Sequence, residues 1–328
     1  MYSLFDYGGM INRANSMRTE AFTQALQRAI TPASVVLDIG TGAGYFALVA
    51  ARFGARHVYA IEPNPIIQVG QEAAIANALD DRITFLQAKS TDVTLPEQAD
   101  IIISDIGGAL PLCGPLIEAL EDARQRLQVP GGKMIPQADM LCATVVQSPR
   151  AYSQLVDPWD HNPAGLDLSA IRQRVTSLVR KQPFKAKHAM TDHQCWATVD
   201  YYQSADPNYA GHLKWQQNEG GTGHGLALWF DRAVDEQCTF SNAPAEPVAN
   251  PIYSNLYMPW SEPIELDVDD VIDVKLRADL VKKQYVWSWK TTVTTAGGEC
   301  KARFAQSSFM SRPIGLTNSE PLSIAKAA

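Results

Sequence analysis

The 328-residue sequence predicts an α/β unit built on a parallel sheet, followed by a unit of antiparallel β strands. Three observations carry this prediction. Up to about Pro136, short β-branched or aliphatic runs alternate with segments of helical periodicity, as in parallel α/β sheets. After Pro136 the segments become aromatic and alternate with a period of two, as half-buried strands do. The chain is also too long for one ordinary core, so we expect two packed units.

The first unit, residues 1–136, is expected to begin with a helix over residues 16–30. Apolar residues recur there at helical spacing, namely Met17, Phe22, Leu26 and Ile30. Strands are then expected at residues 34–39, 57–61, 83–87, 100–104 and 133–135. The helices between them are expected at residues 45–53, 65–77 and 116–127.

The second unit, residues 137–328, is expected to be a barrel or a sandwich of antiparallel strands. Its period-two segments cover residues 196–202, 224–230, 264–276 and 285–292. The alternation is clearest at Ile264, Leu266 and Val268. A helix-like, charged piece at residues 157–190 interrupts this pattern, with a helix expected at 168–179. We expect it to leave the β body as an excursion.

Composition excludes several classes of protein. Apolar residues make up 46% of the chain and charged residues 19%, which is too apolar for a disordered protein. The formal charge of −7 disfavours nucleic acid as a partner. No run reaches the ~18 apolar residues of a membrane span, and we expect no signal sequence, because residues 1–13 lack a basic segment and a long apolar run. The cysteines lack C-x-x-C spacing, so we expect a cytoplasmic protein with no metal site and with reduced Cys113, Cys142, Cys195, Cys238 and Cys300.

The strongest motif is VLDIGTGAG at residues 36–44, between the first expected strand and its helix. Gly40, Gly42 and Gly44 allow backbone amides to approach a ligand, and the following helix N-terminus adds positive potential. Glu62 ends the next strand, where its carboxylate can accept hydrogen bonds from a ribose diol. The alternative explanation of the glycines is a tight strand-to-helix turn that binds no ligand. The combination predicts a nucleotide-type cofactor site.

The spacing also selects among cofactors. The Gly-Lys-Ser/Thr of a P-loop is missing, and the glycines fall as G-x-G-x-G, which differs from the nicotinamide-binding pattern. Asp38 in the turn suits a cofactor with an ammonium group, and S-adenosylmethionine has both an ammonium group and a ribose. We therefore expect a class I methyltransferase. Its cofactor residues are expected to include Ser90 besides those of the motif and Glu62.

Further segments match one known family. They are Met17-Arg18-Thr19, VLDIGTGAG, GARHVYAIE at 54–62, IISD at 102–105, PGGKMIP at 130–136, Trp159 with GLDL at 165–168, and HGLALWFD at 224–231. On these segments the chain resembles the protein arginine methyltransferase family over nearly its whole length.

The resemblance implies a Rossmann-type domain with a seven-stranded sheet, a β-barrel domain and a dimerisation arm, here about residues 157–190. It implies a homodimer formed through that arm. It also implies that Arg18 clamps the cofactor carboxylate, which suits the bidentate geometry of arginine. His224 matches a histidine position in related barrels and is a candidate catalytic residue, although a lone histidine is more often structural.

Two substrate motifs of the family are altered here. The family holds the substrate guanidinium with two glutamates after the fourth strand, and these positions are Asp105 and Gly114. Its Thr-His-Trp loop falls near residues 249–251, which are Ala, Asn and Pro. A guanidinium requires paired acceptors, so we expect the acceptor to be another N or O nucleophile of a peptide, protein or peptide-like metabolite.

Asp105 is the candidate catalytic residue of this altered site. It follows a sheet strand beside the cofactor motif, where it can orient or deprotonate the acceptor. Arginine methylation through Asp105 and a second carboxylate is one alternative. A scaffold subunit that binds cofactor without catalysis is the other.

Overall fold

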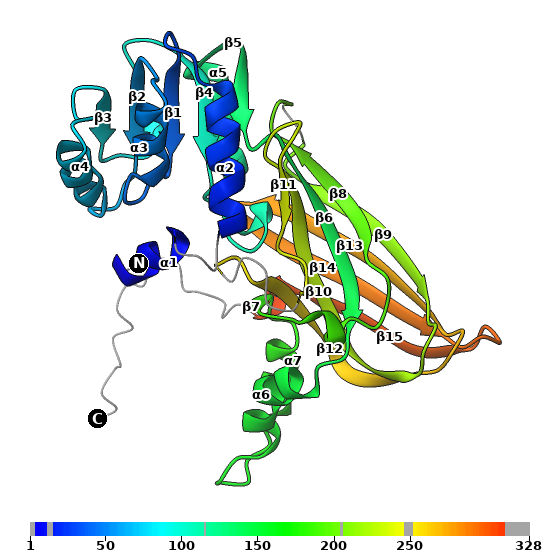
Figure 1. Ribbon diagram of the computed structural model, residues 1–328. Coiled ribbons are helices and arrows are strands. Elements are labelled where there is room, and N and C mark those ends of the chain that lie inside the picture. The colour runs from blue at the N-terminus through cyan, green and yellow to red at the C-terminus, as the bar shows by residue number, and fades with distance from the viewer. Residues whose placement is uncertain (1–3, 12–15, 115, 204–205, 246–251, 312–328) are drawn as a thin grey trace, which may run out of the picture.

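The computed structural model describes residues 4–11, 16–114, 116–203, 206–245 and 252–311. Figure 1 shows a parallel α/β half and an antiparallel β half, with helix α2 (Ser16–Ala29) between them. The predicted fold class is confirmed. A short first helix, α1 (Leu4–Ile11), lies below the parallel sheet in this view.

The parallel sheet has the strand order β3-β2-β1-β4-β5. Its strands are β1 (Val35–Ile39), β2 (His57–Ile61), β3 (Ile83–Leu86), β4 (Ala99–Ser104) and β5 (Gln128–Ile135). The connecting helices are α3 (Tyr45–Arg52), α4 (Ile67–Ala76) and α5 (Leu116–Arg126). Chain order reverses between β1 and β4, and ligands of open parallel sheets bind at such a point.

The parallel sheet is smaller than predicted. Its described part has five strands and not the expected seven. The physical reason is the path of the chain after β5. It crosses Pro136 directly into β6 (Ala138–Val146), which pairs with barrel strands, and none of the described strands after β5 joins the parallel sheet.

The antiparallel half consists of two sheets that face each other (Figure 1). One has the order β7-β12-β10-β6-β8, with β11 paired to β10, and the other has the order β15-β14-β13-β9. Besides β6, the strands are β7 (Arg180–Gln182), β8 (Gln194–Asp200), β9 (Tyr209–Gln216), β10 (Gly221–Ala233), β11 (Thr239–Ser241), β12 (Asn255–Leu266), β13 (Val271–Val281), β14 (Gln284–Thr294) and β15 (Cys300–Ser307). Large buried aromatic side chains, among them Trp260 and Trp289, fill the barrel core.

The segment expected at residues 264–276 is two strands and not one. A turn over residues 267–270 separates β12 from β13, and Asp269 adopts a φ of 69° there. Val268 is 56% exposed in this turn and does not continue the buried row of Leu266. Val268 continues the apolar alternation of Ile264 and Leu266 into the turn, so the periodicity of the sequence did not reveal where β12 ends.

An arm of two helices extends from the barrel (Figure 1). It consists of α6 (Pro149–Asp160) and α7 (Ser169–Val175). It begins before the expected residue 157 because Pro149 starts a helix, a position in which proline is well tolerated. The expected helix at 168–179 is shorter and ends at Val175. Among the described residues, no helix has the length and apolar character needed to cross a bilayer.

The expectation that all five cysteines are reduced is wrong. Cys142 of β6 and Cys195 of β8 form a disulfide. These residues are register partners on neighbouring strands, with a Cα–Cα distance of 4.0 Å. Cysteine spacing along the chain could not reveal this proximity. The other three cysteines are free.

A buried ion-pair network joins the two halves. Arg232 of β10 lies directly opposite Asp139 of β6 in the ladder. Its Nε and Nη2 each donate to a different oxygen of Asp139 at 2.7 Å, and both residues are almost fully buried. Nη1 of Arg232 donates to Asp105 at 2.6 Å. Because Asp105 follows β4, this arginine ties the barrel to the carboxyl end of the parallel sheet.

Arg232→Met should lower the free energy of unfolding by about 3–5 kcal/mol, because it leaves the buried Asp139 without its ion pair and removes one of the two arginines that pair with Asp105. Adding Asp139→Leu should restore part of that loss. Urea unfolding followed by tryptophan fluorescence measures both variants. Arg277→Met, which breaks an exposed pair with Asp279, is the control and should change the free energy of unfolding far less, because solvent screens the pair. Strictly additive losses in the double variant would contradict a coupled buried pair.

Candidate functional site

The glycine-rich loop follows β1 and leads into α3. Gly40, Gly42 and Gly44 have φ angles of 73°, 57° and 82°, a region that favours glycine. A Cβ on Gly42 would lie 2.4 Å from Cε1 of Tyr7, and a Cβ on Gly44 would lie 2.9 Å from the Cα of Gly70. Both the conformation and the close contacts therefore require glycine here.

Glu62, at the end of β2, is held against this loop. One carboxylate oxygen accepts the backbone N–H of Gly42 at 3.2 Å, and the other accepts that of Asn64 at 2.9 Å. Two amides thus fix the orientation of the carboxylate at the edge of the sheet.

A cavity of about 440 Å³ opens beside Gly40 and Glu62. Residues 88–92 form one wall, including the buried Ser90 of a 3₁₀ turn (Ser90–Asp92), and Ala119 of α5 lies on another. The volume lies in the range of small-molecule sites. A fixed carboxylate, a hydroxyl and a glycine loop fit the nucleoside part of S-adenosylmethionine.

Asp38 is a residue of β1, two positions before Gly40, and not part of the turn itself. Its side chain is 3% exposed and accepts a hydrogen bond from the Thr41 hydroxyl at 2.6 Å. Burial raises its pKa to about 7. Asp38 is not among the described residues that line the cavities. Its hydrogen bond to Thr41 instead stabilises the glycine-rich loop. The expected contact with an ammonium group remains a prediction.

A second cavity, of about 360 Å³, adjoins the first. Both are lined by Gly40, Glu62 and Ile106. The second cavity is also lined by Arg18 and Asp105, and by Tyr7, Met10, Asn64, Gly108, Lys181, Ile252 and Tyr253. The structure therefore brings the predicted Arg18, Gly40, Glu62 and Asp105 to one place.

The carboxylate of Asp105 is already occupied by three donors. Arg18 Nε lies 2.5 Å from Oδ2, the Tyr253 hydroxyl lies 2.6 Å from the same oxygen, and Arg232 donates to Oδ1. Burial by itself raises the pKa of Asp105, but the charges of Arg18 and Arg232 outweigh it and hold the pKa below its usual value. The group is thus a firmly ionised carboxylate. An acid or base role for Asp105 remains a prediction.

Arg18 projects from α2 into this network. It is 6% exposed and also donates from Nη1 to the carbonyl of Met10, at 3.3 Å. Burial lowers the pKa of Arg18, but Asp105 and Tyr253 more than compensate, so the pKa is raised. The guanidinium is permanently charged and held in place at the wall of the second cavity.

His224 is not brought to this place. It lies in β10 next to Gly225, with Nδ1 2.8 Å from the carbonyl of Thr222. Its ring packs edge-on against Tyr152 of the arm, and burial lowers its pKa. His224 is not one of the described residues that line either of these two cavities. Its predicted catalytic role gains no support from this position.

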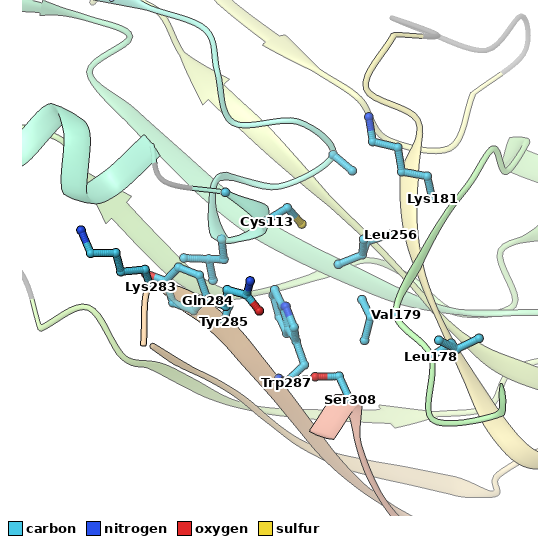
Figure 2. Close-up of a pocket in the computed structure, with 13 residues that line it drawn as sticks. Cys113, Leu178, Val179, Lys181, Leu256, Lys283, Gln284, Tyr285, Trp287 and Ser308 are labelled. Carbon is cyan, nitrogen blue, oxygen red and sulfur yellow. Dashed lines mark hydrogen bonds between the residues drawn. The ribbon is translucent and has the colours of Figure 1, made fainter. Parts of the chain in front are cut away.

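A third and larger cavity, of about 780 Å³, separates the loop after β4 from the barrel (Figure 2). Gly114 and Cys113 line it from the loop, and Lys181 lines it from β7. Lys181 also lines the second cavity, so the two cavities meet at this residue. Residues 249–251, at the expected Thr-His-Trp position, lie outside the described residues.

Sequence reasoning missed Arg232, Asp139, Tyr253 and Lys181. A signal for the first two was present. Arg232 falls in the inward period-two row that ends β10, after Leu226, Leu228 and Phe230, while Asp139 begins the inward row of β6. A charged residue in a buried row requires a partner of opposite charge. Tyr253 and Lys181 stand in no such pattern.

The chain is similar in sequence to several known proteins. The profile of a family described as ribosomal protein L11 methyltransferase (PrmA) matches residues 17–137. Probable protein arginine N-methyltransferase 6 of Arabidopsis thaliana is 28% identical over 243 residues, which are 71% of this chain and 54% of that protein. Protein arginine N-methyltransferase 1 of Dictyostelium discoideum is 30% identical over 242 residues, which are 70% of each. The chain spans about half the length of most of the plant relatives it matches.

Solved structures share the fold. Protein arginine methyltransferase 10 of Arabidopsis thaliana superposes with a TM-score of 0.80 at 19% identity, covering 93% of this chain and 97% of that one. The Trypanosoma brucei PRMT1 enzyme–prozyme heterotetrameric complex with AdoHcy gives a TM-score of 0.79 at 20% identity, covering 89% and 94%. With the 30% identity to the Dictyostelium discoideum protein, the conclusion is plain: the chain belongs to the protein arginine N-methyltransferase family.

Proposed function

We propose that the chain is a methyltransferase that uses S-adenosylmethionine as its methyl donor. The observation that carries this proposal is the cavity where Gly40, Glu62 and Ser90 converge, at the point where chain order reverses in the parallel sheet. Arg18 lies in the adjoining cavity. Membership of the family and the AdoHcy in the Trypanosoma brucei complex support the same cofactor.

The described residues divide the task of holding the donor. Glu62 would accept hydrogen bonds from the ribose diol, and Arg18 would pair with the terminal carboxylate. When bound, the donor supplies a methyl group that its sulfonium has already activated. What is left for the protein is to align the acceptor with that methyl group and to exclude water.

Asp105 suits an orienting role better than that of a base. Three donors already occupy its carboxylate, and its lowered pKa makes it a weak base. We propose that Asp105 is a positioning residue, which fixes Arg18 and the Tyr253 hydroxyl at the wall of the second cavity.

We also propose an acceptor other than the arginine side chain, namely an N or O nucleophile of a peptide, protein or peptide-like metabolite. A guanidinium needs two carboxylates, but Asp105 is neutralised by two arginines and the second position is Gly114. The third cavity presents Lys181 near that position, and a cation there repels a guanidinium.

Two other functions have specific support. The relatives are named arginine N-methyltransferases, which favours arginine as the acceptor and does not support our expectation against it. A related structure is an enzyme–prozyme complex, which favours a scaffold role within a larger assembly. The experiments below separate these functions from the one proposed.

Glu62→Gln should weaken binding of S-adenosylhomocysteine by about 10- to 100-fold, because it removes a charged acceptor from the ribose hydroxyls. Isothermal titration calorimetry measures the affinity. Glu72→Gln on the exposed face of α4 is a matched control and should bind like the unmodified chain. Equal affinities for both variants would refute the role of Glu62.

Glycine–arginine-rich peptides should not be methylated by the unmodified chain, because one neutralised carboxylate cannot hold a buried guanidinium. Mass spectrometry of the peptide after incubation with S-adenosylmethionine tests this. The same preparation must bind S-adenosylhomocysteine.

Clear arginine methylation would overturn the acceptor proposal and leave the donor proposal intact. A chain that binds the donor product but transfers methyl groups to no protein or peptide of a lysate would favour the scaffold role.

We propose that the chain forms a homodimer through its arm. Leu166, in the loop between α6 and α7, is 62% exposed, and Trp159, Leu168 and Ile171 are only partly buried. Such an apolar projection needs a surface that covers it. The heterotetrameric assembly of the Trypanosoma brucei complex is consistent with a family that oligomerises.

Leu166→Glu should shift the chain from dimer to monomer, because it places a charge in the centre of the proposed contact. Light scattering coupled to size-exclusion chromatography at micromolar concentration measures the mass. Val268→Glu, at an equally exposed apolar position in a barrel turn, is the control and should leave the mass unchanged. An unmodified chain that is monomeric would end this proposal.

A further inference from the structure

The third cavity carries an inference about the acceptor that rests on the proposed methyltransferase function. Its walls come from five segments: the loop after β4, the strand β7 with the residues before it, β12, the start of β14 with the residue before it, and Ser308 after β15. Tyr285 and Trp287 provide aromatic surface, with Val179 and Leu256 opposite (Figure 2). At about 780 Å³, it is large enough for a small molecule or a few residues of a peptide.

The charge of this cavity is positive. Its charged lining residues are Lys181 and Lys283, which lie at opposite ends in Figure 2, and its described lining contains no carboxylate. Cys113 is exposed, and a thiol is mostly protonated at neutral pH, so this group adds little negative charge. The cavity is therefore suited to a ligand with a negative group.

The two lysines are not equivalent. Lys283 forms an ion pair with Glu118 of α5, with Nζ 3.0 Å from Oε1. Lys181 takes part in none of the ion pairs found among the described residues. Because it lines both the second and the third cavity, Lys181 presents its cation where a bound acceptor would enter from the barrel side.

We propose that the third cavity binds the methyl acceptor through a carboxylate on Lys181 and an apolar body on Tyr285 and Trp287. A singly charged carboxylate suits these walls better than a phosphate, because removing a second charge from water is costly next to apolar side chains. Lys181 then determines specificity. It attracts an acidic acceptor and repels a cationic one, whereas the described residues offer a guanidinium no free carboxylate in this cavity.

The test uses two probes of the same shape and opposite charge, 4-phenylbutyrate and 4-phenylbutylamine. Saturation-transfer NMR and calorimetry measure their binding to the full chain, with and without S-adenosylhomocysteine. We expect the acid to bind and the amine to bind at least tenfold more weakly. Lys181→Met should weaken the acid about tenfold or more, and Lys181→Glu should reverse the preference in favour of the amine.

The control is Lys275→Met, on an exposed position of β13 outside the three cavities. It should retain the preference of the unmodified chain. Equal binding of acid and amine, or a preference that Lys181→Glu leaves unchanged, would overturn the proposal. A folded chain that selects the acid but does not bind S-adenosylhomocysteine would instead contradict the proposed methyltransferase function, so the two failures are distinguishable.

Discussion

Asp105 is the point on which the arrangement of the site depends. One carboxylate receives Arg18 from α2, Arg232 from the barrel and the Tyr253 hydroxyl from the segment before β12. Buried charges are stable only when they are paired and hydrogen-bonded, so a shift of any of these elements that left Asp105 buried would cost free energy. The same contacts fix the wall of the cavity next to the glycine loop. The contacts that hold the two halves together are therefore also the contacts that shape the site.

This arrangement supports the positioning role that we propose for Asp105. A carboxylate after β4 lies where the resemblance places a substrate contact, yet here the barrel supplies Arg232 and removes the free charge. Arg232 is in turn matched by Asp139 on the neighbouring strand, with Tyr201 donating to the same carboxylate at 2.6 Å. The carboxylates of Asp105 and Asp139 are thus both matched by buried arginines. Any ligand in the adjoining cavities meets Asp105 as a neutralised group.

The parallel half could be predicted closely because local signals specify it. Strand β2 lies where periodicity placed it, and the glycines of the loop adopt the conformations that only glycine adopts easily. The barrel was harder to predict, because the strands that pair in it are distant in sequence. The Cys142–Cys195 disulfide and the pairing of Arg232 with Asp139 depend on strand register, which spacing along the chain does not encode. His224 matches a position in a pattern but does not line the first two cavities, so its catalytic role stays a prediction.

Gly114 illustrates how such a site can change its ligand. Its φ of −157° is extended backbone that any residue adopts, and the nearest atom to a Cβ placed there is the Ile106 carbonyl oxygen at 3.8 Å. Nothing in the backbone requires a glycine. Gly114 lines the third cavity and lies outside the charge network, so a different residue at this position would not disturb the fold. A replacement at Gly114 would therefore change mainly the lining of the third cavity, whereas a replacement of Arg232 would leave the buried Asp139 without its ion pair.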